Sequence, residues 1–363
     1  MTRLPKVLLQ SRYPFKNLVF QGGGVKAYVY HGVLRVLDEY EILPQIQRVA
    51  GTSAGALQAA MLCFRLSIEE TIDLYKTVDY SKIRAPNSGD ASEQTKHGLF
   101  DASLERIRGN VDAANRFFRN YGLYSTDYLH DWLNSTIAKY CDGDSKATFA
   151  DFRNRGFRDL YITTVNISRQ RSEIFSVETT PNAPVADAIL LSAAIPFFFE
   201  AVKFNGKSIG QGDYYIDGGA LNNYPLTIFD HQNFKDRSKH FTYGINWETL
   251  GCQLFTPEEC VDQEAEIQNI LQYAERVVET MGDAQYEAVD MRTVDRWRSM
   301  RISNCCVSTT DFDLFPDESN PKYVEMVKTG EKAAQKYLVD YRLPTDRFAD
   351  AKGKLAELLE LWQ

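Results

Sequence analysis

Two segments near the N-terminus share one pattern: a short apolar run, a glycine-containing turn and an apolar helix. The first comprises residues 17–20, the glycines 22–24 and apolar positions at helical spacing over 25–37. The second comprises residues 47–50, followed by a turn and a helix of small, apolar side chains over 51–64. Two consecutive strand–turn–helix units predict a parallel α/β core with three layers.

The same α/β pattern resumes after residue 158. Its expected strands are 159–166, 172–177, 214–216, 241–246 and 301–307. Helices are expected after a capping box at 256–259 and from Asn320 to about Tyr341. The sequence therefore predicts an α/β protein, an α/β/α sandwich around a mainly parallel sheet, with a mainly helical C-terminal region.

We divide the chain into a catalytic domain over 17–250 and a mainly helical region over 251–363 that packs on it. Residues 80–140 interrupt the α/β pattern. Within them the polar run 86–98 has no periodicity and is expected to be a loop, whereas 128–137 is expected to be helical. This insertion is either a lid over a site or a surface layer of helices.

Composition narrows the class of partner. The chain has 363 residues and a formal net charge of −8, with no basic stripe to neutralise phosphates, so nucleic acid polymers are not expected partners. Its six cysteines match no zinc-site spacing, and the vicinal Cys305 and Cys306 form a poor disulfide pair. Because no apolar run is long enough for a signal peptide or a membrane span, we expect a cytoplasmic protein with reduced thiols.

The sharpest chemical signal is the sequence GTSAG at 51–55, a GxSxG motif between an expected strand and an expected helix. A tight turn there lifts the serine hydroxyl away from the backbone and admits only small flanking residues, here Gly51 and Gly55. Ser53 is therefore a candidate nucleophile. The alternative is a glycine-flanked turn whose serine merely caps the helix.

The first turn, Gly22, Gly23 and Gly24 followed by Lys26, is suited to binding an anion. Glycines let backbone N–H groups face a cavity, and the N-terminus of a helix favours negative charge. The anion is either the oxyanion of acyl transfer or a nucleotide phosphate. A dinucleotide-binding unit is disfavoured by Ala27 and by the lack of an acidic residue after a clear second strand.

A third motif, Asp217, Gly218 and Gly219, follows the expected strand 214–216. A carboxylate at a strand end can accept a serine proton, and the glycines leave backbone room beside it. Asp-Gly is also a favoured hairpin turn, so this segment alone does not decide between base and turn.

An ordinary catalytic triad would need a histidine after the acid. His231 and His240 are the histidines beyond Asp217, and neither lies in a recognisable motif. The other histidines are expected to be surface or packing residues: His31, His97 and His130.

Together and in this order, GGGVK, GTSAG, the block LSAAIPFFF at 191–199 and DGG resemble the patatin-like phospholipase family. The resemblance covers about residues 18–229 and implies a dyad, with Ser53 as nucleophile and Asp217 as base. It also implies an oxyanion hole at glycines 22–24, with Lys26 where the family has Arg or Lys. The supporting motif glycines would be Gly51, Gly55, Gly218 and Gly219, and Ala27 departs from the glycine of many relatives.

The resemblance implies hydrolysis of acyl esters, of the phospholipase A or lysophospholipase type, through an acyl-enzyme and without metal or other cofactor. The substrate would be a membrane phospholipid or another acyl lipid, reached by peripheral contact. Residues 197–199 either line an acyl channel or belong to the core. Two alternatives stay open: a signalling effector switched on by a ligand such as a cyclic nucleotide, as in some bacterial patatin-like defence enzymes, and a non-catalytic lipid- or nucleotide-binding module. The head group, the activator and the oligomeric state are undetermined.

Overall fold

The computed structural model describes residues 12–79, 82–83, 119–261 and 293–347 apart from 345, together with isolated positions between 262 and 292. The isolated positions are 267, 273, 276, 277, 280, 281 and 285. The expected loop at 86–98 lies outside the described residues.

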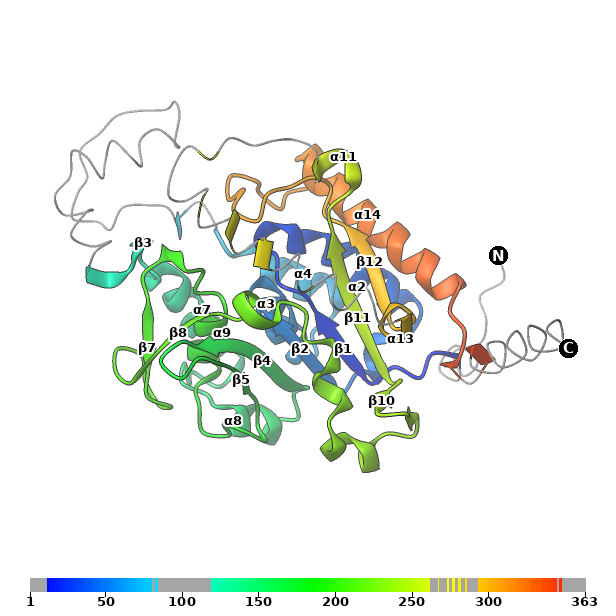
Figure 1. Ribbon diagram of the computed structural model, residues 1–363, viewed down its shortest axis with the longest axis horizontal. Helices are drawn as coiled ribbons and strands as arrows, with labels where there is room; N and C mark the ends of the chain where they lie inside the picture. The colour runs from blue at the N-terminus through cyan, green and yellow to red at the C-terminus, as the bar shows by residue number, and fades with distance from the viewer. Residues whose placement is uncertain are drawn as a thin grey trace, which may run out of the picture.

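A mainly parallel sheet lies at the centre of the described part (Figure 1). Its strand order is β12-β11-β1-β2-β4-β8-β7, and an eighth strand, β5, pairs with β4. The strands from β12 to β4 are mutually parallel, whereas β5 and β8 pair with β4 in antiparallel fashion. The strands are β1 (Asn17–Phe20), β2 (Arg48–Thr52), β4 (Asp159–Asn166), β5 (Arg171–Phe175), β7 (Val202–Phe204), β8 (Asp213–Asp217), β11 (Thr249–Phe255) and β12 (Ser299–Ser303).

Two cores lie on opposite faces of this sheet. Leu18 and Phe20 of β1 belong to the larger core, which they share with the main helices, whereas the intervening Val19 packs with Phe229 and Phe234 in the smaller one. This alternation follows from the two-residue period of a strand. The predicted mainly parallel α/β sandwich is confirmed. The main helices are α2 (Val29–Glu39), α3 (Ala54–Cys63), α4 (Ile68–Lys76), α7 (Asp127–Tyr140), α8 (Phe149–Asn154), α9 (Val185–Ser192) and α14 (Pro321–Val339), and the smaller core is covered by η4 (Leu226–Asp230) and η5 (Gln232–Arg237).

Helix α14 crosses α2 in direct backbone contact. A β-carbon on Gly32 would lie 1.9 Å from the carbonyl oxygen of Val327, and one on Gly330 would lie 1.9 Å from that of Val29. At its start, the Asn320 side chain accepts backbone N–H groups, as expected for a helix cap. The helix predicted from residue 320 is therefore present and packs tightly on the core.

The main difference from the sequence-based picture is β11. This strand was not predicted, yet it lies between β1 and β12. The division of the chain at 250/251 falls within it, so the C-terminal region contributes two strands to the sheet as well as helices. The expected strand at 301–307 is found earlier, at Ser299–Ser303.

The segment 241–246 forms a small hairpin instead of one strand. Strands β9 (Phe241–Thr242) and β10 (Ile245–Asn246) pair in antiparallel fashion. Between them Tyr243 and Gly244 have positive φ angles of 54° and 74°. Two consecutive residues with positive φ turn the chain back on itself, as in type I′ hairpins.

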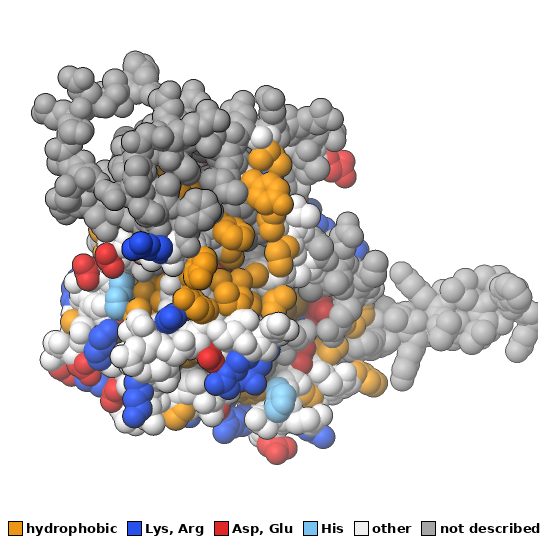
Figure 2. All heavy atoms as spheres, turned by 60° about the vertical axis from the view of Figure 1, so that its left-hand side comes forward, with side chains coloured by type: hydrophobic (Ala, Val, Ile, Leu, Met, Phe, Trp, Pro, Cys, Tyr) orange, Lys and Arg blue, Asp and Glu red, His pale blue; other side chains and the backbone are white. Residues whose placement is uncertain are grey.

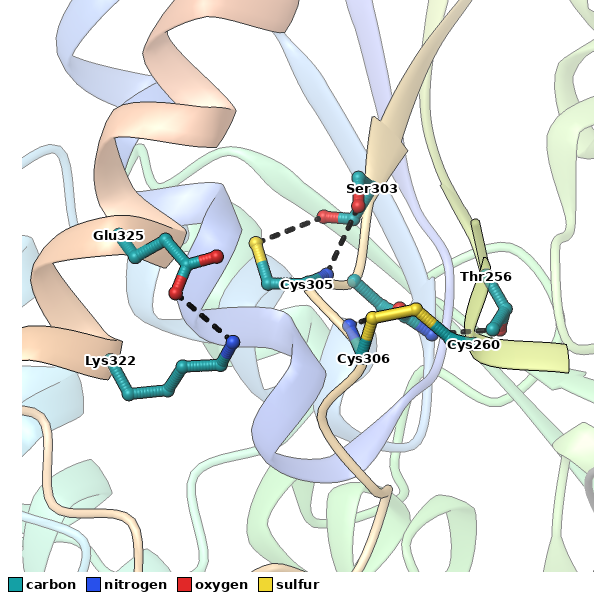
Figure 3. Close-up of a disulfide and its surroundings, with 8 residues drawn as sticks. Thr256, Cys260, Ser303, Cys305, Cys306, Lys322 and Glu325 are labelled. Atoms are coloured by element: carbon teal, nitrogen blue, oxygen red, sulfur yellow. Dashed lines mark hydrogen bonds and ion pairs between the residues drawn. A yellow bond between two sulfur atoms is a disulfide. The ribbon is translucent and has the colours of Figure 1, made fainter. Parts of the chain in front are cut away.

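The expectation of reduced thiols throughout is wrong for one pair. Cys260, in the short helix α11 (Glu258–Val261), forms a disulfide with Cys306 in the loop after β12 (Figure 3). The two cysteines are separated by 46 residues in the sequence, so their pairing depends on the fold and left no local signal. The free cysteines among the described residues are Cys63, Cys141, Cys252 and Cys305.

Candidate active site

Strand β4 brings the two candidate residues Ser53 and Asp217 together. Since β5 occupies one edge of β4, strands β2 and β8 share the other. Strand β2 ends where Thr52 pairs with Thr163, and the next residue of β4, Thr164, pairs with Asp217 at the end of the antiparallel β8. The two strands run towards each other, so their ends meet.

At this meeting point the Ser53 hydroxyl donates a hydrogen bond to Asp217 Oδ2 at 2.5 Å. Oδ1 of the same carboxylate accepts the N–H of Gly219 at 2.6 Å. Asp217 is only 2% exposed. Its burial raises the pKa of Asp217 to about 6, although the hydrogen bonds from Ser53 and Gly219 each lower it. The site therefore holds a carboxylate that is more basic than an ordinary aspartate.

Ser53 has an unusual backbone, with φ 55° and ψ −127°. This region is strained for a residue with a side chain. The turn is also crowded: a β-carbon on Gly51 would lie 2.2 Å from the carbonyl oxygen of Gly55, and one on Gly55 would lie 2.6 Å from that of Gln21. The two glycines of GxSxG are therefore required by space.

The helix-cap interpretation of this motif is wrong. Ser53 occupies the N-cap position of α3, but its side chain makes no capping hydrogen bond and donates to Asp217 instead. The hairpin interpretation of Asp217-Gly218 is wrong as well, because the chain continues into the short helix α10 (Gly219–Asn222). Each motif thus contributes its side chain to one shared site.

The glycine loop lies against Ser53. A β-carbon on Gly22 would lie 3.1 Å from Ser53 Cβ, and the Gly22 N–H donates to the Asn223 carbonyl at 3.0 Å. The loop then enters the 3₁₀ helix η1 (Gly24–Tyr28), which precedes α2. In the part of the chain that the structure describes, the Gly23 and Gly24 amides have no acceptor, whereas that of Gly22 is already engaged.

Two residues that sequence reasoning missed make hydrogen bonds to the loops around Ser53 and Asp217. The Asn223 side chain donates to the Gly22 carbonyl at 3.3 Å. The Gln285 side chain accepts the Asn223 N–H at 2.8 Å and donates to the Gly219 carbonyl at 3.0 Å. These contacts span 62 residues or more of sequence, so no local motif signals them.

The described histidines do not bond to the candidate dyad. His31 is buried and hydrogen-bonds the Tyr323 hydroxyl, and burial lowers the pKa of His31 to about 3. His130 contacts Asp187 at 2.7 Å. His231 accepts the N–H of the nearby Asn233, and neither it nor His240 has a hydrogen bond to Ser53 or Asp217 within the described residues. His97 lies outside those residues.

Apolar side chains gather on the face shown in Figure 2. In the block at 191–199, Phe198 and Phe199 belong to the core, whereas Phe197 is 45% exposed. Leu221, four residues after Asp217, is 49% exposed. Across the residues described, no helix is long and apolar enough to cross a membrane, and no cluster of His, Cys, Asp or Glu is arranged to hold a metal.

Comparison with known proteins gives several relatives of low identity. Protein R571 of Acanthamoeba polyphaga mimivirus is 27% identical over 62% of this chain and 64% of its own length. The protein named Probable lipid hydrolase 463L of Invertebrate iridescent virus 6 is 27% identical, covering 64% of this chain and 69% of that protein. YqhO of Bacillus subtilis is 25% identical over 88% of this chain and 97% of its own length.

Among solved structures, VipD from Legionella pneumophila has a similar fold. Its TM-score is 0.53 with 16% identity, covering 90% of this chain and 67% of that chain. The family model for patatin-like phospholipases matches residues 18–230, which include the glycine loop, the serine turn and the aspartate. This chain therefore belongs to the patatin-like phospholipase family.

Proposed function

We propose that this protein is a lipid acyl-hydrolase of the phospholipase A or lysophospholipase type, with Ser53 as nucleophile and Asp217 as base. The observation that carries the proposal is the 2.5 Å hydrogen bond between Ser53 Oγ and the buried Asp217 carboxylate. Family membership and the 27% identity to a protein named as a probable lipid hydrolase support the substrate class.

In the proposed reaction, Asp217 takes the Ser53 proton while Oγ attacks the ester carbonyl carbon. A pKa of Asp217 near 6 serves this step, because a base works best when its pKa lies near the working pH. Asp217 then gives its proton to the leaving alcohol, and an acyl-enzyme remains. Water attacks the acyl-enzyme with Asp217 again as base, which releases the fatty acid and restores Ser53.

The negative charge on the tetrahedral oxygen needs nearby donors. We assign this role to the glycine loop, as the sequence suggested, and within it to the amides of Gly23 and Gly24. Gly22 supports the role differently, since its N–H is held by Asn223 and its missing side chain leaves room beside Ser53.

Exposed apolar groups support a lipid substrate. Phe197 lies within the block at 191–199, and Leu221 lies on α10, four residues after Asp217. Both are nearly half exposed, and the face in Figure 2 carries a contiguous set of hydrophobic side chains. Such surface on a protein is typical of contact with apolar ligands or membranes. We therefore propose peripheral contact with a lipid surface during catalysis.

The test uses the full chain with vesicles that contain phospholipids and neutral lipids, and reads released fatty acids by mass spectrometry. The proposal predicts release by the wild type and none by Ser53→Ala. A fluorophosphonate probe should label the wild type and not Ser53→Ala. If the wild type is labelled but releases fatty acid only after a cyclic dinucleotide is added, the ligand-switched effector is favoured. Absence of labelling would favour a non-catalytic module.

A further inference from the structure

Ser192, the last residue of α9, is fully buried and bridges two strands at the candidate active site. Its hydroxyl oxygen accepts the backbone N–H of Ser53 at 2.8 Å and donates its proton to the Thr163 carbonyl at 2.6 Å. Thr163 is the β4 residue that pairs with Thr52, the last residue of β2. The Ser192 side chain therefore links β4 to the tight turn that follows β2 and carries Ser53, which we call the serine elbow.

This bridge supports a conformation that is otherwise unfavourable. Ser53 has a positive φ of 55°, which a residue with a side chain adopts only when its surroundings hold it there. Its N–H is buried, and a buried donor without an acceptor is costly. A serine hydroxyl has one proton, and Ser192 gives that proton to Thr163, so a lone pair is left to face the Ser53 N–H.

The same segment also holds the base. The Ser192 carbonyl accepts the Gly218 N–H at 3.3 Å, and the Ala194 carbonyl accepts the Asp217 N–H at 2.8 Å. The end of α9 thus makes hydrogen bonds to the backbone on both sides of the Ser53–Asp217 contact. A shift of this segment would change the distance between the two side chains.

We propose that Ser192 is a positioning residue for the Ser53–Asp217 pair, whose hydroxyl holds the elbow so that Ser53 Oγ is directed at Asp217 Oδ2. The inference rests on the proposed function, in which these two side chains are nucleophile and base. Ser192 acts through the Ser53 backbone and does not itself contact the reacting ester.

The test compares Ser192→Ala, Ser192→Thr and the control Ser176→Ala in the full chain. Ser176 is also a buried serine whose hydroxyl accepts backbone N–H groups, those of Glu178 and Thr179, and within the described residues it has no hydrogen bond to Ser53 or Asp217. The measurement is the rate of fluorophosphonate labelling of Ser53 as a function of pH, with the melting temperature recorded for each variant.

We expect Ser192→Ala to be labelled roughly 10- to 100-fold more slowly than the wild type, because small misplacements of reacting groups have effects of this size. Ser192→Thr, which keeps the hydroxyl, should recover most of the rate, and Ser176→Ala should stay within about twofold of the wild type. The acid limb of the Ser192→Ala profile should also move to higher pH, because the Ser53 hydrogen bond lowers the pKa of Asp217. A loss of global stability alone would not move this limb.

A Ser192→Ala variant labelled at the wild-type rate with an unmoved acid limb would overturn the inference. If Ser192→Ala does not fold, Ser192→Cys provides the same test, because the thiol is similar in size but a weak acceptor. Wild-type behaviour of a folded Ser192→Cys would again overturn it. Absence of labelling in the wild type contradicts the proposed function instead, so the two failures are distinguishable.

Discussion

The two ends of strand β8 carry aspartates in opposite environments. At its start, Asp213 is partly exposed and accepts hydrogen bonds from Asn166 and Arg169, which lower the pKa of Asp213. At its end, Asp217 is buried and has no cationic partner among the described residues, and burial raises the pKa of Asp217 to about 6. Four residues along one strand thus separate a carboxylate stabilised as an anion from one made more basic.

The two aspartates differ in pKa because the two ends of β8 place their carboxylates in different surroundings. Asp213 lies at the start of β8, where its side chain is 31% exposed and pairs with Arg169. Asp217 lies where β8 meets the end of β2, and within the described residues its oxygens accept hydrogen bonds from Ser53 and Gly219. Variants at the two ends of β8 therefore provide matched tests.

The largest expected difference is in activity. Asp217→Asn should reduce the rate of fatty-acid release by about a thousandfold or more, as is typical when a catalytic base is removed, and Ser53→Ala should do the same. Asp213→Asn changes the same chemical group on the same strand and should stay within about threefold of the wild type, because the ion pair with Arg169 and the hydrogen bond from Asn166 that it affects do not involve Ser53. Equal losses at both ends would contradict the assignment of Asp217 as base.

Alanine substitutions of glycines near the two ends of β8 should lower the free energy of unfolding by different amounts. A β-carbon on Gly218 would lie 2.3 Å from the Thr163 carbonyl oxygen, a backbone atom that cannot move aside easily. We expect Gly218→Ala to lower the free energy of unfolding by about 3–4 kcal/mol. Gly210, in the turn before β8, has a positive φ of 99° but open space around its α-carbon. Gly210→Ala should cost only about 1–2 kcal/mol.

Denaturant unfolding of both alanine variants measures these costs. A Gly218→Ala protein as stable as Gly210→Ala would mean that the backbone beside Asp217 is less tightly packed than the structure indicates.

The two aspartates should affect the pH dependence of stability in opposite directions. A raised pKa means that the contribution of Asp217 is present in full below pH 3.8 and is lost as the pH rises through about 6. Asp217→Asn lacks this loss, so its stability relative to the wild type should increase by roughly 2–3 kcal/mol between pH 4 and pH 7. For Asp213, whose pKa is lowered, the stabilisation is present above pH 3.8 and is lost as the pH falls through its folded pKa.

Unfolding free energies of the wild type, Asp217→Asn and Asp213→Asn from about pH 2 to about pH 7 provide the measurement, because the Asp213 difference develops below pH 3.8 and the Asp217 difference above it. The account requires the two difference curves to slope in opposite directions. Parallel curves would show that the two carboxylates share one environment.

The local parts of this architecture were predictable from the sequence. Glycine turns, apolar runs and helical spacing are signals within one segment, and they predicted β1, β2, β4, α3 and α14. The serine and aspartate motifs were likewise found because each is a short, local pattern. Their alternatives could be excluded only from the structure: the Ser53 side chain donates to Asp217 instead of capping α3, and the chain after Gly218 continues into α10 instead of a hairpin.

Contacts between distant segments were not predictable. Strand β11 was missed because Gly251 interrupts its apolar run, yet that glycine is required: a β-carbon there would lie 1.7 Å from the Tyr224 hydroxyl oxygen. The bridge from Ser192 to Ser53 spans 139 residues, and the Cys260–Cys306 disulfide spans 46. Such pairings depend on the finished sheet, so the sequence identified the block at 191–199 without indicating which of its residues bonds to Ser53.

The central claim is that a buried aspartate with a raised pKa deprotonates Ser53 directly. The most direct test is the pH dependence of fluorophosphonate labelling of Ser53 in the wild type and in Asp217→Asn. The account predicts that the wild-type rate rises with pH through an apparent pKa near 6, and that Asp217→Asn is labelled very slowly at every pH. Labelling of Asp217→Asn at the wild-type rate, with the same pH profile, would contradict it.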